Sequence, residues 1–284
     1  MAQFWFLFPC FIVASAYKPV VLVHGIMDNA ESMEGMKQFI VEAHPGTNVT
    51  LVNLFSDLLS LTDMWDQVAG FGDTIRDVMA NSPDGIHLLC FSQGGLSCRG
   101  VLQSTPNHTV DTFVSLSSPQ AGQYGDTDYI KFLPTFLKEE LYRLFYTPDG
   151  QKISVGNYWN DPLHHDLYLK ENVFLPLLNN EINSSYSAVN KSGIVRLKKL
   201  VTIGGPDDGV ITPWQSSHFA FYKTGSSTEI VETRDQEGYQ NDAIGLKTLD
   251  ERGDFIVYNI TGVQHIYWHR NRTVFDCCIE KWLT

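Results

Sequence analysis

The sequence has few basic residues and no block of them. Its 284 residues include 20 lysines and arginines against 32 aspartates and glutamates, which gives a formal net charge of −12 at pH 7. A protein that binds nucleic acid, or that docks electrostatically on an anionic membrane, needs clustered positive charge. The charge balance therefore argues against nucleic acid as a partner and against membrane docking through basic residues.

Cysteines and long apolar runs are also scarce. Five cysteines are too few for a disulfide-dense scaffold, so the core must come from the burial of ordinary apolar side chains. Beyond the N-terminal segment, no apolar run has the roughly 20 residues that a membrane span needs. The sequence also has no internal repeat and no low-complexity tract. We expect a mature chain without a transmembrane segment.

The N-terminal segment is apolar from Phe4 to Val13 and continues into Ala14-Ser15-Ala16. A short apolar stretch that ends in an A-x-A pattern is typical of a cleaved secretory signal peptide. Six N-x-S/T sequons agree with passage through the secretory pathway, where each could carry a glycan. The sequons begin at Asn48, Asn107, Asn183, Asn190, Asn259 and Asn271. We therefore expect a signal peptide over residues 1–16 and a glycoprotein comprising residues 17–284.

Apolar runs of strand length alternate with segments of helical periodicity along much of the chain. The expected strands cover residues 19–23, 49–54, 86–89, 110–116, 197–204 and 255–258. The expected helices cover residues 31–41, 63–81, 96–103 and, at the end of the chain, about 273–282. Strands that are apolar throughout are typical of a parallel sheet with helices on both faces, so the sequence predicts an α/β fold.

The alternation is interrupted between about residues 120 and 196. This segment is rich in aromatic residues, and Leu137, Leu141, Leu144 and Phe145 have helical spacing, but no strand–helix unit is recognisable. We interpret it as a cap inserted into the α/β domain.

Ser92 lies in the segment Cys90-Phe91-Ser92-Gln93-Gly94-Gly95, between an expected strand and an expected helix. This is the context of a nucleophile elbow, a strained turn that presents a serine hydroxyl and needs small flanking residues. Gly94 and Gly95 provide that room on the helix side, and Cys90 replaces the usual glycine on the strand side. A serine in an ordinary surface turn can give the same short motif, so the interpretation depends on partners elsewhere in the chain.

A serine hydroxyl becomes a nucleophile when a histidine takes its proton and a carboxylate orients that histidine. In α/β-hydrolases the acid and then the histidine follow the serine, each on a loop after a strand. The loop after the 197–204 strand holds Asp207 and Asp208, and the loop after the 255–258 strand holds His265. The two aspartates compete for the acid position, and turn formation or capping is the alternative role for Asp207.

Acyl transfer also needs two N–H groups that bind the developing oxyanion. The backbone of Gln93, which directly follows the serine, is one candidate. The second candidate lies in the loop after the first strand, at Ile26 or Met27, where the neighbouring His24 can serve simply to brace the loop.

Cys90 ends the strand before the elbow, and Cys98 lies about two turns into the following helix. We predict a disulfide between them, which requires the helix to fold back beside the end of the strand.

His265 and His269 have a spacing that zinc sites use, but no third ligand stands at a suitable distance along the sequence. We therefore expect no metal and no cofactor.

Several segments resemble the palmitoyl-protein thioesterases, a family within the α/β-hydrolases. These segments are His24-Gly25, Phe91-Ser92-Gln93-Gly94-Gly95, Tyr158-Trp159-Asn160-Asp161-Pro162, Asp208-Gly209-Val210-Ile211-Thr212-Pro213 and Phe219-Ala220-Phe221-Tyr222. Cys90, Trp214-Gln215-Ser216-Ser217 and Trp268-His269-Arg270-Asn271-Arg272-Thr273 look most like the lysosomal type-2 branch of the family. The resemblance runs from about Lys18 to the C-terminus and implies an α/β-hydrolase fold. The pairing of Cys277 and Cys278 stays unassigned, because the chain departs from the family there.

The resemblance also implies roles for individual residues. Ser92 corresponds to the nucleophile, Asp208 to the orienting acid and His265 to the base, while Ile26 and Gln93 fall on the oxyanion positions. The implied reaction is the hydrolysis of long-chain fatty acyl thioesters, such as palmitoyl-CoA or S-acylated cysteine, through an acyl-enzyme. The acyl chain would lie in an apolar groove shaped by the insertion, and the protein would be lysosomal or secreted.

Two other functions fit the same sequence. A lipase or carboxylesterase would use the same triad on oxygen esters, and a catalytically inactive hydrolase fold would serve only for binding. Hydrolysis rates for an oxygen ester and a thioester of the same acyl chain distinguish a lipase or carboxylesterase from a thioesterase. Labelling of Ser92 by a fluorophosphonate distinguishes an active enzyme from an inactive binding protein.

Overall fold

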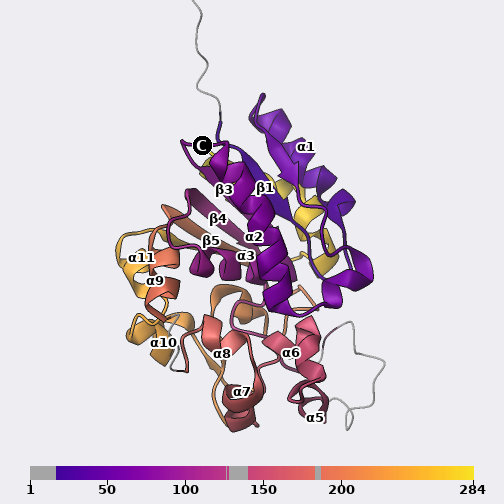
Figure 1. Ribbon diagram of the computed structural model, residues 1–284, viewed down its shortest axis with the longest axis vertical. Helices are drawn as coiled ribbons and strands as arrows, with labels where there is room; N and C mark the ends of the chain where they lie inside the picture. The colour runs from indigo at the N-terminus through magenta and orange to yellow at the C-terminus, as the bar shows by residue number, and fades with distance from the viewer. Residues whose placement is uncertain (1–16, 126, 128–139, 183–186) are drawn as a thin grey trace, which may run out of the picture.

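The computed structural model describes residues 17–125, 127, 140–182 and 187–284 (Figure 1). The expected signal peptide over residues 1–16, the sequon residue Asn183 and the side chain of Asn190 lie outside this description. Within the described residues, no helix combines the length and the apolar character needed to cross a membrane.

A six-stranded sheet forms the centre of the molecule, in the order β2-β1-β3-β4-β5-β8, and each neighbouring pair is parallel. Its strands are β1 (Val20–Val23), β2 (Val49–Leu51), β3 (Ile86–Phe91), β4 (Val110–Leu116), β5 (Lys199–Gly204) and β8 (Phe255–Asn259). Every residue of β1, β3 and β4 is buried, as expected for strands covered on both faces. The strand order reverses between β1 and β3, which is where open α/β sheets place their ligands.

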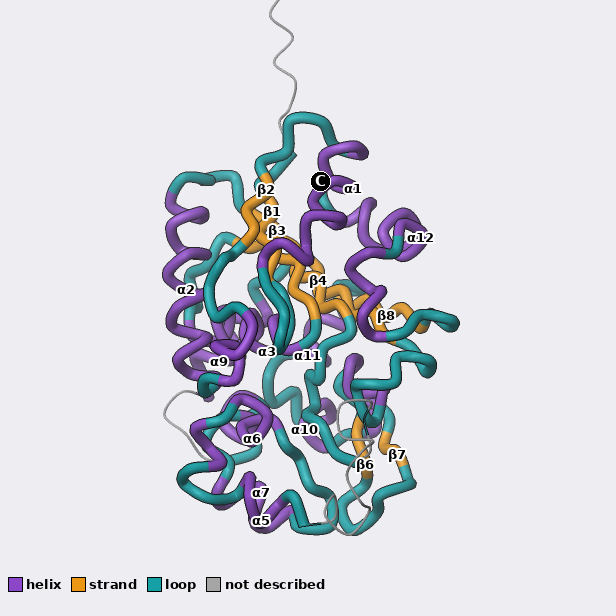
Figure 2. The backbone as a smooth tube through the Cα atoms, turned by 90° about the vertical axis from the view of Figure 1, so that its right-hand side faces the viewer, coloured by secondary structure: helices purple, strands orange, loops and turns teal. Residues whose placement is uncertain are grey.

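Helices cover both faces of the sheet (Figure 2). Val21 and Val23 of β1 belong to the core beneath α2, α3, α9 and α11, whereas Val20 and Leu22 belong to the core beneath α1 and the C-terminal helical segment. The side chains alternate between the two cores because successive residues of a strand point to opposite faces. The helices are α1 (Glu34–Ala43), α2 (Met64–Ala80), α3 (Gln93–Ser104), α9 (Ser187–Val195) and α11 (Leu246–Glu251).

A second group of short elements lies beyond one edge of the sheet, in the lower half of Figure 1. It contains α5 (Tyr142–Phe145), α6 (Ser154–Tyr158), α7 (His165–Glu171), α8 (Leu175–Leu178), α10 (Glu237–Gln240) and the antiparallel pair β6 (Phe221–Tyr222) and β7 (Ile230–Val231). The segment interpreted as a cap supplies α5 to α8, whereas α9 from the same segment packs beside α3. The chain between β5 and β8 supplies the rest.

The expected elements differ from the structure mainly at their ends. The second strand stops at Leu51 rather than residue 54, although Val52 still donates to the Leu22 carbonyl. The closing helix expected at 273–282 is divided into an α turn, α12 (Arg272–Val274), a π-helical turn (Phe275–Ile279) and a 3₁₀ turn (Glu280–Trp282). Apolar periodicity identifies such a segment as helical but does not distinguish these closely related hydrogen-bond patterns.

Candidate active site

Ser92 occupies a strained turn between β3 and α3. Its backbone has φ 54° and ψ −130°, a conformation that a residue with a side chain adopts at a cost, and the residue is only 3% exposed. A Cβ atom added at Gly94 would collide with the His24 carbonyl oxygen, and one at Gly95 would collide with the Ser118 hydroxyl. The small residues that the sequence places after the serine are therefore required by close packing of the neighbouring loops.

His265 connects Ser92 to Asp208. Its Nε2 atom lies 2.9 Å from Ser92 Oγ, and its Nδ1 atom lies 2.9 Å from Asp208 Oδ2 and 3.0 Å from Oδ1. The backbone N–H of His265 also donates to the Asp208 carbonyl oxygen at 2.9 Å. Because β3, β5 and β8 are parallel, the loops after their carboxyl ends meet at one edge of the sheet and bring the three residues together.

Both carboxylate oxygens of Asp208 accept several hydrogen bonds. Trp268 Nε1 donates to Oδ2 at 2.6 Å, the Ser117 hydroxyl donates to Oδ2 at 2.5 Å, and the backbone N–H groups of Val210 and Ile211 donate to Oδ1 at 3.0 and 2.7 Å. Burial alone would raise the pKa of Asp208, but the hydrogen bonds and the charge of its partners, His265 first, lower this pKa below its ordinary value. The site thus keeps the carboxylate ionised and fixed in orientation.

The structure places Asp207 away from this chain of hydrogen bonds. Its Oδ2 atom accepts the backbone N–H of Gly262 at 2.7 Å, on the exposed side of the loop that leads to His265. Of the two competing aspartates, Asp208 contacts the histidine, and Asp207 joins the two loops.

The two oxyanion candidates in the first loop also differ in their hydrogen bonds. The Met27 N–H donates to the Ser60 hydroxyl at 2.7 Å and is therefore occupied. The N–H groups of Ile26 and Gln93 have no acceptor within the described part of the chain. His24 braces this loop, since its ring nitrogens lie 2.8 Å from the Gly25 carbonyl oxygen and 2.9 Å from that of Leu54.

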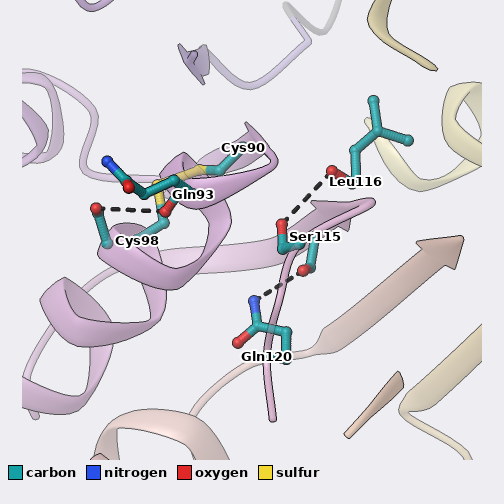
Figure 3. Close-up of a disulfide and its surroundings, with 8 residues drawn as sticks. Cys90, Gln93, Cys98, Ser115, Leu116 and Gln120 are labelled. Carbon is teal, nitrogen blue, oxygen red and sulfur yellow. Dashed lines mark hydrogen bonds between the residues drawn. A yellow bond between two sulfur atoms is a disulfide. The ribbon is translucent and has the colours of Figure 1, made fainter. Parts of the chain in front are cut away.

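Cys90 and Cys98 are joined by a disulfide with a Cα–Cα distance of 6.6 Å, within the usual range. Figure 3 shows the bond running from the end of β3 to the first turns of α3, next to Gln93. The disulfide thus ties together the two elements that form the elbow. Cys277 and Cys278, which the sequence left unassigned, are joined to each other.

Of the sequon residues, Asn48, Asn107 and Asn259 are exposed. Asn271 is half-buried, and its Oδ1 atom accepts the Val274 N–H at the start of α12. Within the described residues, no cluster of three histidine, cysteine or acidic side chains has an arrangement that would hold a metal ion, and His265 and His269 form no such cluster.

Sequence reasoning missed the roles of Ser117 and Trp268 as partners of Asp208. Ser117 follows β4, which lies between the strands that precede Ser92 and Asp208, and Trp268 stands three residues after His265 on the same 3₁₀ turn (His265–Arg270). For Ser117, the sequence position could have indicated this role. A polar residue directly after a central parallel strand lies at the carboxyl end of the sheet, where the site is expected.

Comparison with known proteins assigns the family. A family model described as palmitoyl protein thioesterase matches residues 19–265. Lysosomal thioesterase PPT2 of Homo sapiens is 48% identical over 271 residues, which cover 95% of this chain and 89% of the relative. The PPT2 homolog of Drosophila melanogaster is 47% identical, with 95% and 93% covered. Palmitoyl-protein thioesterase 1 of Caenorhabditis elegans is 30% identical, with 93% and 91% covered.

Among solved structures, the mature form of the lipase BlEst2 of Bacillus licheniformis is similar with a TM-score of 0.50 and 15% identity, covering 95% of this chain and 94% of that one. At this identity the likeness concerns the fold, which agrees with the parallel sheet and the elbow described above. The chain therefore belongs to the palmitoyl protein thioesterase family and has its α/β-hydrolase fold.

Proposed function

We propose that this protein hydrolyses long-chain fatty acyl thioesters through an acyl-enzyme formed on Ser92. Membership of the family supports the reaction, and the names of its relatives support a thioester as the substrate. The observation that carries the assignment of residues is the buried, continuous chain of hydrogen bonds from Ser92 through His265 to Asp208.

In the first step, His265 Nε2 takes the hydroxyl proton of Ser92 while Oγ attacks the thioester carbonyl carbon. The N–H groups of Ile26 and Gln93 bind the oxyanion of the tetrahedral intermediate. The C–S bond then breaks, the sulfur leaves with the electron pair as a thiolate, and the acyl group stays on Ser92 as an ester. A thiolate leaves readily, so protonation by His265 contributes less to bond cleavage here than in amide hydrolysis. The proton held by His265 then passes to the departing sulfur, which releases a free thiol and returns His265 to its neutral form before the second step.

In the second step, a water molecule gives a proton to His265 and attacks the acyl ester. The fatty acid leaves, and the proton held by His265 returns to Ser92. In both steps Asp208 accepts the Nδ1–H of His265 and leaves Nε2 facing the serine, which is the tautomer that can act as a base. The donors around Asp208 keep the carboxylate in the ionised form that this role requires.

Apolar side chains flank the proposed catalytic residues and are well placed to contact an acyl chain. Met27 follows Ile26 and is 53% exposed, and Leu58 and Leu59, at 68% and 66%, stand in the 3₁₀ turn (Asp57–Leu61) that binds Met27. We propose that the acyl chain lies over these side chains, which belong to the loops after β1 and β2 rather than to the inserted segment that the family resemblance implied.

A separate cavity of about 610 Å³ lies between the inserted segment and the chain after β5. Its walls include Asn160, Leu169, Phe219 and Tyr239 but none of the three triad residues, so it is separate from the proposed catalytic site.

The relatives of Homo sapiens and Drosophila melanogaster are named lysosomal thioesterases, and we infer the same location for this protein. The exposed sequon residues Asn48, Asn107 and Asn259 are compatible with glycosylation in the secretory pathway.

The proposal is tested with an oxygen ester and a thioester of the same palmitoyl chain, using the wild type and Ser92→Ala. We expect kcat/KM to be higher for the thioester and activity to be lost in the variant. A preference for the oxygen ester would identify a lipase or carboxylesterase instead, and a wild type that neither turns over substrate nor reacts with a fluorophosphonate would indicate a binding protein.

A further inference from the structure

Ser60 is a buried serine with an unusual set of polar contacts. The residue is 1% exposed, and its hydroxyl accepts the backbone N–H of Met27 at 2.7 Å. Its carbonyl oxygen accepts two side-chain amides, from Gln67 Nε2 and from Gln93 Nε2, each at 2.8 Å. Buried polar groups of this kind hold their partners in one arrangement when they are satisfied.

These contacts reach both sides of the proposed oxyanion hole. Gln93 supplies one N–H donor from its backbone, and its side chain is the group bound to Ser60. Ile26 supplies the other donor, and the next residue, Met27, is bound to the Ser60 hydroxyl. A single residue that lies outside the triad and both donor loops therefore contacts the donor residue on one side and its neighbour on the other.

The hydrogen bond between Ser60 and Met27 also helps to hold Met27 in a strained backbone conformation. Met27 has φ 53°, a left-handed conformation that a residue with a side chain adopts at a cost. The hydrogen bond to Ser60 holds the peptide of Met27 in this conformation and so limits the directions that the preceding N–H, that of Ile26, can take.

Gln67 completes the network. Its Oε1 atom accepts from Gln93 Nε2 at 3.1 Å, and its Nε2 atom also donates to the Thr62 carbonyl oxygen at 2.7 Å. Gln67 is 2% exposed, so water does not compete for these bonds. The side chain of Gln93 is thereby held between Ser60 and Gln67.

We infer that Ser60 is a positioning residue that sets the separation and direction of the two oxyanion donors, with Gln67 in support. The inference rests on the proposed function. Removing an oxyanion donor outright lowers kcat about 10²- to 10³-fold. Ser60→Ala leaves both donors in place but frees the Met27 loop, so we expect a decrease in kcat of about tenfold. KM should stay nearly constant, because the oxyanion exists only after attack on the carbonyl.

The experiment compares wild type, Ser60→Ala and the matched control Ser56→Ala, whose hydroxyl donates to the side chain of Asn53 at the surface and, among the described residues, to no group of the proposed site. Three quantities are measured: kcat and KM for a palmitoyl thioester, the affinity for a long-chain trifluoromethyl ketone, and the affinity for the unreactive thioether analogue of the substrate. The ketone forms an adduct with Ser92 that carries an oxyanion, whereas the thioether does not.

We expect Ser60→Ala to weaken ketone binding by about the same factor as kcat, while KM and thioether affinity change less than twofold. The control should match the wild type in all three. An unchanged kcat, or equal losses in ketone and thioether binding, would overturn the inference.

If Ser60→Ala fails to fold, Gln67→Met is tested in the same way and should give a smaller effect with the same selectivity for the ketone. If the wild type binds the ketone but hydrolyses no thioester, the proposed function fails, and the ketone affinities still decide the role of Ser60.

Discussion

The replacement Asp208→Asn tests the most constrained residue of the site. The Oδ1 atom of Asp208 accepts two backbone N–H groups, so the oxygen of an asparagine would take that position and its NH₂ group would replace Oδ2. This NH₂ group would then face Trp268 Nε1–H and His265 Nδ1, which lie 2.6 and 2.9 Å from Oδ2. Two donors cannot pair, and the histidine would accept at Nδ1 and carry its proton on Nε2.

In that tautomer His265 cannot take the proton of Ser92. The equivalent change in other serine triads lowers kcat by about 10⁴-fold, and we expect a similar loss here. The unpaired N–H of the buried Trp268 should also lower the free energy of unfolding by about 1–3 kcal/mol. The matched control is Asp207→Asn, whose amide oxygen can still accept the Gly262 N–H and which should change kcat/KM by less than about twofold.

The assay is steady-state hydrolysis of a palmitoyl thioester at several concentrations, with urea denaturation of each variant to exclude unfolding. If Asp208→Asn keeps more than about a tenth of wild-type kcat, the hydrogen-bond reasoning is wrong. If Asp207→Asn causes the larger loss, the orienting acid is one residue earlier in the chain.

Three further predictions concern stability and substrate choice. Cys90→Ala with Cys98→Ala should lower the free energy of unfolding by about 2–3 kcal/mol, because the disulfide closes a short loop; unchanged urea midpoints would contradict this. Burial lowers the pKa of His218 to about 4, below the unfolded value of about 6.5, so its contribution to stability is present above pH 6.5 and is lost as the pH falls toward 4. The fall in unfolding free energy between pH 7.5 and pH 5 should therefore be about 2 kcal/mol smaller in His218→Asn, and an equal fall in both proteins would refute it. The double replacement Leu58→Ser with Leu59→Ser should raise KM about tenfold for a palmitoyl thioester, as expected from the loss of contact with about two buried CH₂ groups of the acyl chain, and should leave KM for a butyryl thioester unchanged. The control Leu144→Ser, which changes another exposed leucine, should match the wild type. An equal rise in KM for both substrates would count against the proposed acyl site.

The sequence predicts the sheet well because its central strands are buried on both faces. A run such as Ile86-His87-Leu88-Leu89 is most simply interpreted as a buried strand when small residues and a helix follow it. Ser92, the predicted nucleophile, stands directly after such a strand, β3, in the structure. His265, the predicted base, stands on the longer loop after β8, which is only partly buried, so its prediction depended on the order of the triad residues along the chain. Their positions depend on local sequence and on the rule that parallel strands end at one edge of the sheet.

The rest of the site depends on contacts between distant parts of the chain. Nothing near Ser60 in the sequence indicates that its hydroxyl meets Met27, 33 residues earlier. The choice between Asp207 and Asp208 is a matter of the direction in which two adjacent side chains point. The resemblance to the family implied Asp208, but the strand-and-loop pattern alone does not specify it. Only the packed structure shows which carboxylate meets His265 and Trp268.

Most of the short elements beyond the sheet were also not predicted. The helical spacing that includes Leu144 and Phe145 did indicate the helical turn α5 (Tyr142–Phe145), although Leu137 of that pattern lies outside the described residues. A helix such as α8 (Leu175–Leu178) has only four residues, too few for an apolar period to repeat. The part of this region formed by the chain after β5 was missed for the same reason, since β6 and β7 have two residues each.

The central claim is that catalysis proceeds through an acyl group carried by Ser92. The most direct measurement is rapid quenching of the wild type during turnover of a palmitoyl thioester, followed by proteolysis and mass spectrometry of the peptide that contains Ser92. We predict one palmitoyl group on Ser92 in the wild type, formed at least as fast as steady-state turnover, and none on this peptide in Ser92→Ala. A wild type that turns over the thioester without this adduct, or that carries it on another residue, would contradict the account.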